Sequence, residues 1–240
     1  MAGAKELVSM KSLNIPWLKI RSRWVACVDL LGFRKLISEK HWFNVASIYE
    51  QSLEQLIEGP HTSNHVEYVW FSDTFLLYSE DDSLGGFAEI ECRVRGFVNG
   101  LIMKKIPFRG ALSCGLFFAQ KQDNIFIGPA LVDAYQLCED QNWIGFVLSP
   151  DAVARMRVLG LPPDERLNYS FWPVPRKKNQ SHERLLSLLV GGPCIDSRQT
   201  YGHDVLVELR DRAQEDSVRT KYDNTLQFLE EAGKFFTVPQ

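Results

Sequence analysis

The sequence predicts an α+β fold in which helices flank a mixed, mainly antiparallel sheet, of the ferredoxin-like, palm type. Apolar runs rich in β-forming residues alternate with segments whose apolar residues recur at helical spacing. One connection between strands is a direct hairpin, so the sheet is not purely parallel. The 240 residues, 45% hydrophobic and 24% charged, suffice to bury a sizeable core.

The first half of the chain contains the clearest strand signals. The apolar run 24–33 predicts a central strand that ends in a turn at Gly32. A helix is expected over 34–57, because apolar residues recur at helical spacing up to a Gly-Pro stop. Residues 65–79 then predict a hairpin with Asp73 in the turn at its tip.

The second half continues the alternation. A helix over 84–105 precedes the strand PFRGALSCGLFFAQ, and a short helix begins at Gly128-Pro129, where proline fits the first turn. Strands are expected at 143–149, 167–175 and 185–192, and an amphipathic helix at 217–236.

Charge and composition limit the classes of function. Lys+Arg 27 against Asp+Glu 30 gives a net charge of −3, which disfavours broad nucleic-acid binding but leaves a basic pocket for one nucleotide open. The five cysteines form no CxxC pair, which argues against a zinc site. No secretory signal and no run of about 18 apolar residues occurs, so we expect a cytoplasmic location away from membranes.

Two acids stand out within apolar surroundings. Asp29 interrupts the run WVACVDLLGF with no basic residue nearby in sequence, and an unpaired buried charge is costly. The end of this strand and the tip carrying Asp73 can lie side by side, where two carboxylates would repel each other without a cation between them. This pattern indicates a divalent metal site. The alternative is a helix-capping Asp29 and an Asp73 that closes an Asx turn.

Three motifs in order then resemble a known family. VDLLGF, FSDTFLLY and FRGALSCG followed by GPALVDAYQL resemble the class III nucleotidyl cyclase domain. SDTFLLY, RGALSCG and GPALVDAYQL are similar, more narrowly, to the bacterial pyrimidine cyclases of the Pycsar antiphage system. The resemblance implies an N-terminal extension over 1–23, a cyclase catalytic domain over 24–180, and a C-terminal strand and helix over 181–240 packed on the same domain.

The resemblance also implies site residues. Asp29 and Asp73 would be the catalytic metal ligands, with the carbonyl of Leu30, for two divalent ions per site, Mn²⁺ preferred and Mg²⁺ possible. The backbone amides at the N-terminus of a helix bind anions well, so the turn that leads into the expected helix is a suitable place for phosphates. The expected nucleotide and phosphate contacts are the amides of Leu31, Gly32 and Phe33 and the side chains of Arg34, Arg109 and Lys177.

The chain departs from the purine cyclases at four positions. The two polar residues that select the base in that family fall on Val69 and Ile125, and its Asn/Arg transition-state pair falls on Val132 and Gln136. Either the chain is a catalytically dead cyclase-fold binding module, or it takes another base and draws the missing charge from Arg109 or Arg34.

Bulky residues at the expected base pocket favour a pyrimidine. That pocket comprises Tyr68, Val69, Trp70, Phe71 and Ile125, although plain core packing would also explain several of them. The predicted reaction is conversion of UTP to 3′,5′-cyclic UMP and pyrophosphate, as an antiphage signal to a separate effector. Conversion of CTP to cyclic CMP is the alternative, and FSDTF argues against a GGDEF-like cyclase. A homodimer with composite sites is expected.

Overall fold

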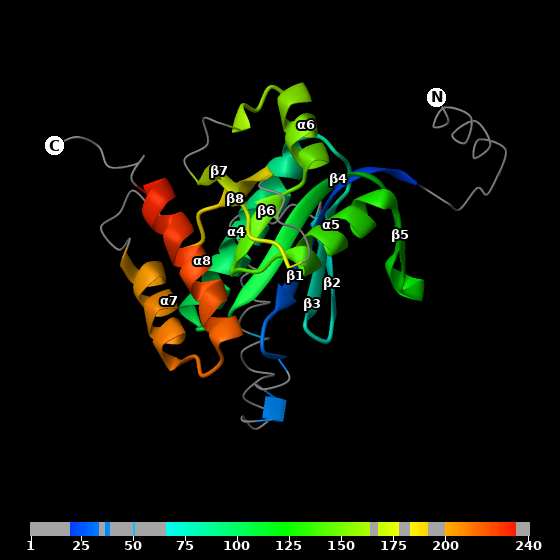
Figure 1. Ribbon diagram of the computed structural model, residues 1–240. Helices are drawn as coiled ribbons and strands as arrows, with labels where there is room; N and C mark the ends of the chain where they lie inside the picture. The colour runs from blue at the N-terminus through cyan, green and yellow to red at the C-terminus, as the bar shows by residue number, and fades with distance from the viewer. Residues whose placement is uncertain are drawn as a thin grey trace.

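The computed structural model describes residues 20–33, 37–38, 50, 66–163, 168–177, 183–191 and 200–233. Within them, one sheet carries the strand order β2-β3-β1-β4-β6-β8-β7, and β5 pairs with β4 (Figure 1). The strands are β1 (Arg21–Leu30), β2 (Val66–Phe71), β3 (Thr74–Ser79), β4 (Phe108–Gln120), β5 (Ile125–Ile127), β6 (Gly145–Leu148), β7 (Tyr169–Pro173) and β8 (Arg184–Leu188).

Among these strands, β4 and β6 run parallel, and the other neighbours are antiparallel. The predicted mixed, mainly antiparallel sheet with flanking helices is therefore confirmed. The hairpin over β2 and β3 also forms, with Ser72 and Asp73 in its turn.

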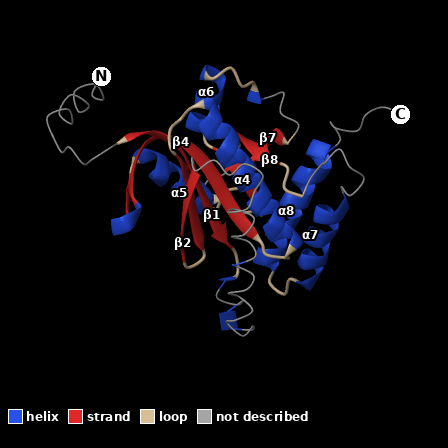
Figure 2. Ribbon diagram, turned by 180° about the vertical axis from the view of Figure 1, so that it is seen from behind, coloured by secondary structure: helices blue, strands red, loops and turns tan. Residues whose placement is uncertain are grey.

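Helices α4 (Leu84–Met103) and α5 (Pro129–Asp140) pack on opposite faces of the sheet, as Figures 1 and 2 show from the front and from behind. Successive residues of a strand point to opposite faces. Trp24, Ala26 and Val28 accordingly join the core cluster that includes α4 residues. Cys27 joins the cluster that includes α5 residues. Asp29, two positions after Cys27, shares the α5 face.

Three more helices complete the described chain: α6 (Pro150–Val158), α7 (Thr200–Arg212) and α8 (Asp216–Gly233). The hydroxyl of Thr225 on α8 accepts from the Ile144 amide and donates to the Ile144 carbonyl oxygen, both at 2.9 Å. The Asn224 side-chain amide donates to the Asn142 carbonyl oxygen at 2.9 Å. These bonds fix α8 to the residues that lead into β6.

The topology gathers several chain segments at one end of the sheet, here called the Asp29 end. Because β1 is antiparallel to β4 and β4 is parallel to β6, the last residues of β1 lie beside the first residues of β4 and β6. The β2–β3 turn lies there too, since Asp29 pairs with Thr74. The start of α8 reaches the same end (Figure 1).

The sequence expectations for other elements have mixed outcomes. The structure confirms the predicted helices that became α4, α5 and α8, and the strands that became β6, β7 and β8. Helices α6 and α7 were not predicted. Most of the helix expected over 34–57 lies outside the described residues. None of the helices in the described part of the chain is long and apolar enough to cross a membrane.

Candidate active site

The two candidate metal ligands lie on adjacent chain segments. The Leu30 amide donates to the Asp73 carbonyl oxygen at 2.8 Å, which fixes the hairpin turn to the end of β1. The side chain of Asp29 is only 14% exposed. The sequence argument that a strand end and a hairpin tip place these two acids side by side agrees with this arrangement.

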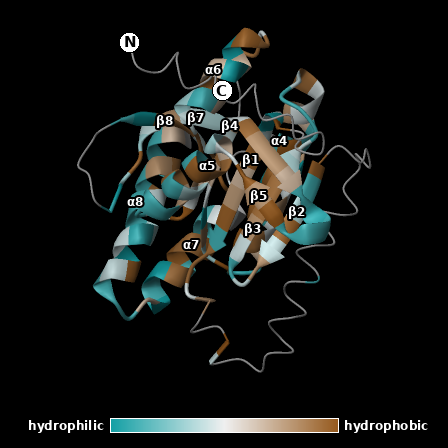
Figure 3. Ribbon diagram, turned by 90° about the vertical axis from the view of Figure 1, so that its right-hand side faces the viewer, coloured by the Kyte–Doolittle hydropathy of each residue, from teal (hydrophilic) through white to brown (hydrophobic). Residues whose placement is uncertain are grey.

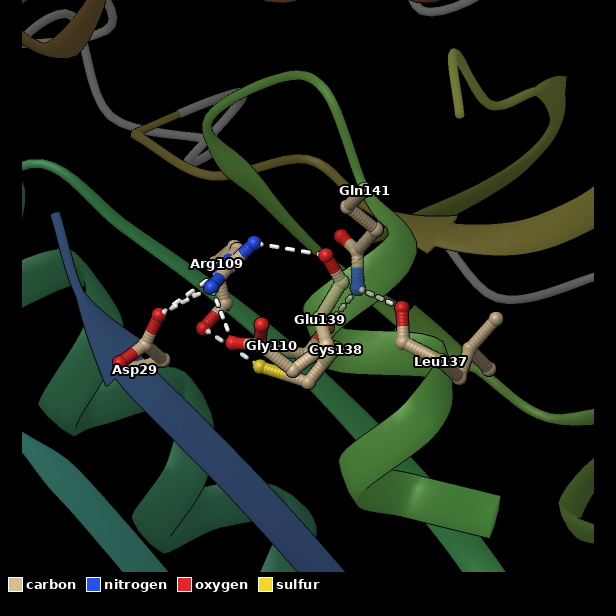
Figure 4. A network of polar contacts seen from close by, with 7 residues as sticks. All are labelled: Asp29, Arg109, Gly110, Leu137, Cys138, Glu139 and Gln141. Carbon is tan, nitrogen blue, oxygen red and sulfur yellow. Dashed lines mark hydrogen bonds and ion pairs between the residues drawn. The ribbon is translucent and has the colours of Figure 1, made fainter. Parts of the chain in front are cut away.

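Arg109, the second residue of β4, is on the same face and is the ionic partner of Asp29. Its Nε donates to Asp29 Oδ2 at 2.8 Å, and its Nη2 forms an ion pair with the same oxygen at 2.7 Å (Figure 4). It also pairs with the Glu139 carboxylate and donates from Nη1 to the Glu139 carbonyl oxygen at 2.7 Å. Asp29 is therefore not an unpaired buried charge. The basic residue that pairs with it lies 80 positions away in sequence.

Burial sets the protonation tendencies of this cluster. Burial raises the pKa of Asp29, and repulsion from Asp73 and Glu139 adds to the rise, against the opposing effect of Arg109. For Arg109, burial alone would lower the pKa, but the hydrogen bond and charge of Asp29 outweigh it and raise the pKa. The cluster thus holds a permanently charged guanidinium and a carboxylate whose ionisation is costly.

A second layer of contacts holds the end of α5 against β4. The Gln141 amide donates to the carbonyl oxygens of Gly110 at 2.9 Å and Leu137 at 3.0 Å, and the Cys138 thiol donates to the Arg109 carbonyl oxygen at 3.4 Å (Figure 4). At the same position β4 also lies close to β6, since a Cβ added at Gly110 would lie 2.5 Å from the Phe146 ring. These contacts position Glu139 beside Arg109.

The turn after β1 supports only part of its expected phosphate-binding role. Gly32 has φ +73°, the left-handed conformation that the predicted turn requires. The Leu31 amide, however, donates to the Pro107 carbonyl oxygen at 2.8 Å, so it is not available to a phosphate. Phe33 packs against the core, and Arg34 lies outside the described residues.

The five residues expected to form a base pocket do not converge. Tyr68 packs against the α4-side cluster, and Trp70 stacks on Phe75 of that cluster at 5.8 Å between ring centroids. Val69 packs instead on the opposite face, which Asp29 shares. Phe71 is 82% exposed at the hairpin tip, and Ile125 lies on the outlying strand β5.

Lys177 lies beside the C-terminal end of α5. The Lys177 amide donates to the Asp140 carbonyl oxygen at 2.8 Å. Burial and then the charge of Arg109 lower the pKa of Lys177. Lys177, Glu139 and Tyr135 line a cavity of about 740 Å³, a volume in the range of small-molecule sites.

The acidic side chains at this site decide whether it could hold the expected divalent metal. Among the described residues, no three or more His, Cys, Asp or Glu side chains form a group that could hold a metal ion. Asp29 and Asp73 supply two carboxylates, and Mg²⁺-type ions are commonly held by one or two carboxylates together with substrate phosphates. The residues therefore fit a metal that arrives with a nucleotide, provided that Asp29 is released from Arg109.

Two residues of α5 at this site are not among the expected catalytic and binding residues. Glu139 binds Arg109, and Tyr135, one helical turn earlier, is half exposed on the cavity wall. The Glu139 charge is the largest cause that raises the pKa of Tyr135. The i, i+4 spacing of the two residues on the predicted helix was the available signal.

No protein-family model matches the chain, and no curated protein sequence matches it. Solved structures do. The catalytic core of a rhodopsin-guanylyl cyclase with converted specificity, in complex with ATPαS, has a TM-score of 0.51 at 11% identity and covers 70% of this chain and 95% of its own. The guanylyl cyclase Cya2 has a TM-score of 0.51 at 8% identity and covers 72% of this chain and 93% of its own. The chain therefore has the α+β fold of nucleotidyl cyclase catalytic domains.

Proposed function

We propose that this protein is a metal-dependent pyrimidine nucleotide cyclase that converts UTP to 3′,5′-cyclic UMP and pyrophosphate. The observation that carries the proposal is the placement of Asp29 and Asp73 on adjoining segments at one end of a cyclase-type sheet. In the reaction, the ribose 3′-oxygen loses its proton and bonds to the α-phosphorus, the bond from that phosphorus to the bridging oxygen breaks, and pyrophosphate leaves.

Asp29, Asp73 and the Leu30 carbonyl would hold the metal ions, with Mn²⁺ preferred over Mg²⁺. A divalent cation bound there lowers the pKa of the 3′-hydroxyl and neutralises charge on the departing pyrophosphate. The protein's own task is to keep the carboxylates charged, to orient the triphosphate, and to exclude water from the reacting atoms.

The Arg109 contacts suggest how Asp29 becomes available. Arg109 has two carboxylate partners, Asp29 and Glu139, and also donates to the Glu139 carbonyl oxygen. With Arg109 held by Glu139, the Asp29 carboxylate would be available to hold a divalent cation that arrives with the nucleotide. Arg109 and Lys177 would then supply positive charge to the triphosphate.

Preference for UTP is the finer part of the proposal. The positions of the two purine selectors hold Val69 and Ile125, neither of which can hydrogen-bond a base through its side chain. Val69 is the one of these on the Asp29 face. UTP and CTP differ at one edge of the base, so a cytidylate cyclase remains the alternative substrate class.

The proposed active form is a homodimer. Apolar side chains are exposed near the hairpin tip, on β5 and on α5, namely Phe71 at 82%, Ile127 at 64% and Val132 at 49%. Strand β5 is coloured as strongly hydrophobic in Figure 3. A two-fold contact through these elements would cover them and close the base side of each site with residues from the partner.

The biological role proposed is signalling in antiphage defence. The cyclic nucleotide would act on a separate effector, and the cyclase itself would contact neither nucleic acid nor membrane.

The test is incubation of the full chain with each of the four nucleoside triphosphates and Mn²⁺. Pyrophosphate release and a cyclic UMP product identified by mass would support the proposal, and more cyclic CMP than cyclic UMP would transfer it to CTP. A purine cyclic nucleotide as the main product would overturn the pyrimidine assignment. Tight nucleotide binding with no turnover would favour a binding module, for which Val132 and Gln136 at the transition-state positions argue.

A further inference from the structure

We infer that the C-terminal helix α8 supplies Lys221 as a further ligand for the polyphosphate of the nucleotide, beside Lys177 at the Asp29 end of the sheet. The inference rests on the proposed function for the identity of the ligand. It assigns a binding role to an element that neither the motifs nor the expected site residues include.

The position of Lys221 follows from how α8 is anchored. Thr225, one helical turn after Lys221, holds both the amide and the carbonyl of Ile144. The next residue, Gly145, is the register partner of Arg109. Lys221 is thereby fixed near the start of β6, next to the strand that carries the guanidinium of the candidate site.

The residues around Lys221 also place it near the end of β1. Together with Leu31, Gly32, Pro107 and Ile144, it lines a second cavity, of about 400 Å³, at the turn after β1. Burial is the largest cause that lowers the pKa of Lys177, and the charges of Arg109 and Lys221 lower it further, while Glu139 and Asp29 oppose them. Lys221 therefore lines the cavity at the glycine turn that follows Asp29, and its charge acts on the lysine expected on the triphosphate.

The balance of charge at the site is the reason to expect an additional basic side chain. A nucleoside triphosphate brings about four negative charges to a site that already contains Asp29, Asp73 and Glu139. Arg109 is engaged by two of these carboxylates. Among the described residues, neither Lys177 nor Lys221 takes part in an ion pair. Two lysines whose charges repel each other would be stabilised by a polyanion that binds both.

The matched control lies on the same helix. Arg219 is exposed and two residues from Lys221, which places it about 200° around the helix, on the opposite side. Its contacts are local, to Asp216 and the Ala213 carbonyl oxygen. Lys221→Gln and Arg219→Gln change the net charge equally, so a difference between them reports position rather than overall charge.

The experiment measures inorganic tripolyphosphate binding to the full chain by calorimetry, and the KM for the nucleotide that is turned over. Lys221→Gln should weaken tripolyphosphate binding and raise KM about tenfold, Lys221→Arg should restore most of both, and Arg219→Gln should match the wild type. Melting curves confirm that each variant is folded.

The outcomes separate this inference from the proposed function. Cyclic nucleotide formation with an unchanged KM and unchanged tripolyphosphate affinity in Lys221→Gln overturns the role of Lys221 and leaves the cyclase. Lys221-dependent tripolyphosphate binding without turnover of any nucleotide supports the polyphosphate site and overturns the cyclase. Failure of the wild-type chain to bind tripolyphosphate overturns the inference.

Discussion

Asp29 and Arg109 face each other as register partners on antiparallel strands, and their side chains form an ion pair of 2.7 Å in which both are largely buried. This pair occupies the carboxylate that the proposed metal needs. The proposed cyclase reaction requires that this pair be exchangeable, and Glu139 is the second partner that could hold Arg109.

Removing Arg109 should cost stability. Arg109→Ala leaves two carboxylates facing each other without their shared cation, one of them only 14% exposed, so we expect the free energy of unfolding to fall by about 3 kcal/mol. Arg95→Ala, which removes a more exposed pair with Glu91, should cost about 0.5 kcal/mol. Urea denaturation of both variants gives the comparison. Equal losses would mean that the buried pair contributes no more than a surface pair.

Asp29→Asn should abolish turnover and remove a pH dependence. Because burial raises the pKa of Asp29 above its ordinary value, the folded wild type binds more protons than the unfolded chain just above pH 3.8. Its stability contribution from this group is therefore lost as the pH rises from that value through the native pKa. The melting temperature of the variant relative to wild type should thus increase from pH 4 to pH 7. A relative decrease over that range would contradict the assignment.

Two glycines should respond in opposite directions to alanine. A Cβ at Gly110 would lie 2.5 Å from the Phe146 ring and 3.0 Å from the Cys27 carbonyl oxygen, so Gly110→Ala should destabilise the fold by about 2 kcal/mol. Gly96 lies in α4 with nothing within 4 Å of an added Cβ, so Gly96→Ala should stabilise it by about 1 kcal/mol. Chemical denaturation measures both, and a stabilised Gly110→Ala would refute the close approach of β4 and β6.

The homodimer can be tested on two exposed valines. Val132 on α5 lies in the proposed interface, whereas Val158 on α6, 73% exposed, lies outside it. Val132→Arg should convert the protein to a monomer and lower activity at least tenfold, since a buried unpaired cation opposes association. Val158→Arg should remain a dimer with wild-type activity. Sedimentation gives the oligomeric state of each variant, and the turnover rate is measured on the same samples. A fully active monomer would exclude composite sites.

Local sequence signals predicted the elements that carry the site. Apolar, β-forming residues on both sides of a polar turn were enough to predict the β2–β3 hairpin. Gly128-Pro129 was enough to predict the start of α5, because both patterns depend on only a few neighbouring residues. Helix α6 was missed although Ser149 caps it and Pro150 opens it, since it is only nine residues long. The expected base pocket does not form, because successive residues of a strand point to opposite faces of the sheet. Tyr68 and Val69 therefore lie on opposite faces.

Contacts between residues far apart in the chain could not be predicted from the sequence patterns. The Asp29–Arg109 pair joins residues 80 positions apart, and its register depends on the packing of the whole sheet. The same holds for the hydrogen bond from Leu31 to Pro107, which removes an amide from the expected phosphate cradle. Lys221 has no motif around it, and only the docking of α8 on Ile144 brings it to the turn after β1.

The central claim, that Asp29 and Asp73 act together as the catalytic metal ligands, is tested most directly by the rate of cyclic UMP formation in Asp73→Ala at saturating UTP and Mn²⁺. Loss of several kcal/mol of charge stabilisation predicts a fall of about 10³-fold with an unchanged melting temperature. Asp223→Ala, which removes an exposed carboxylate from α8, should keep the wild-type rate. A wild-type rate in Asp73→Ala would contradict the account.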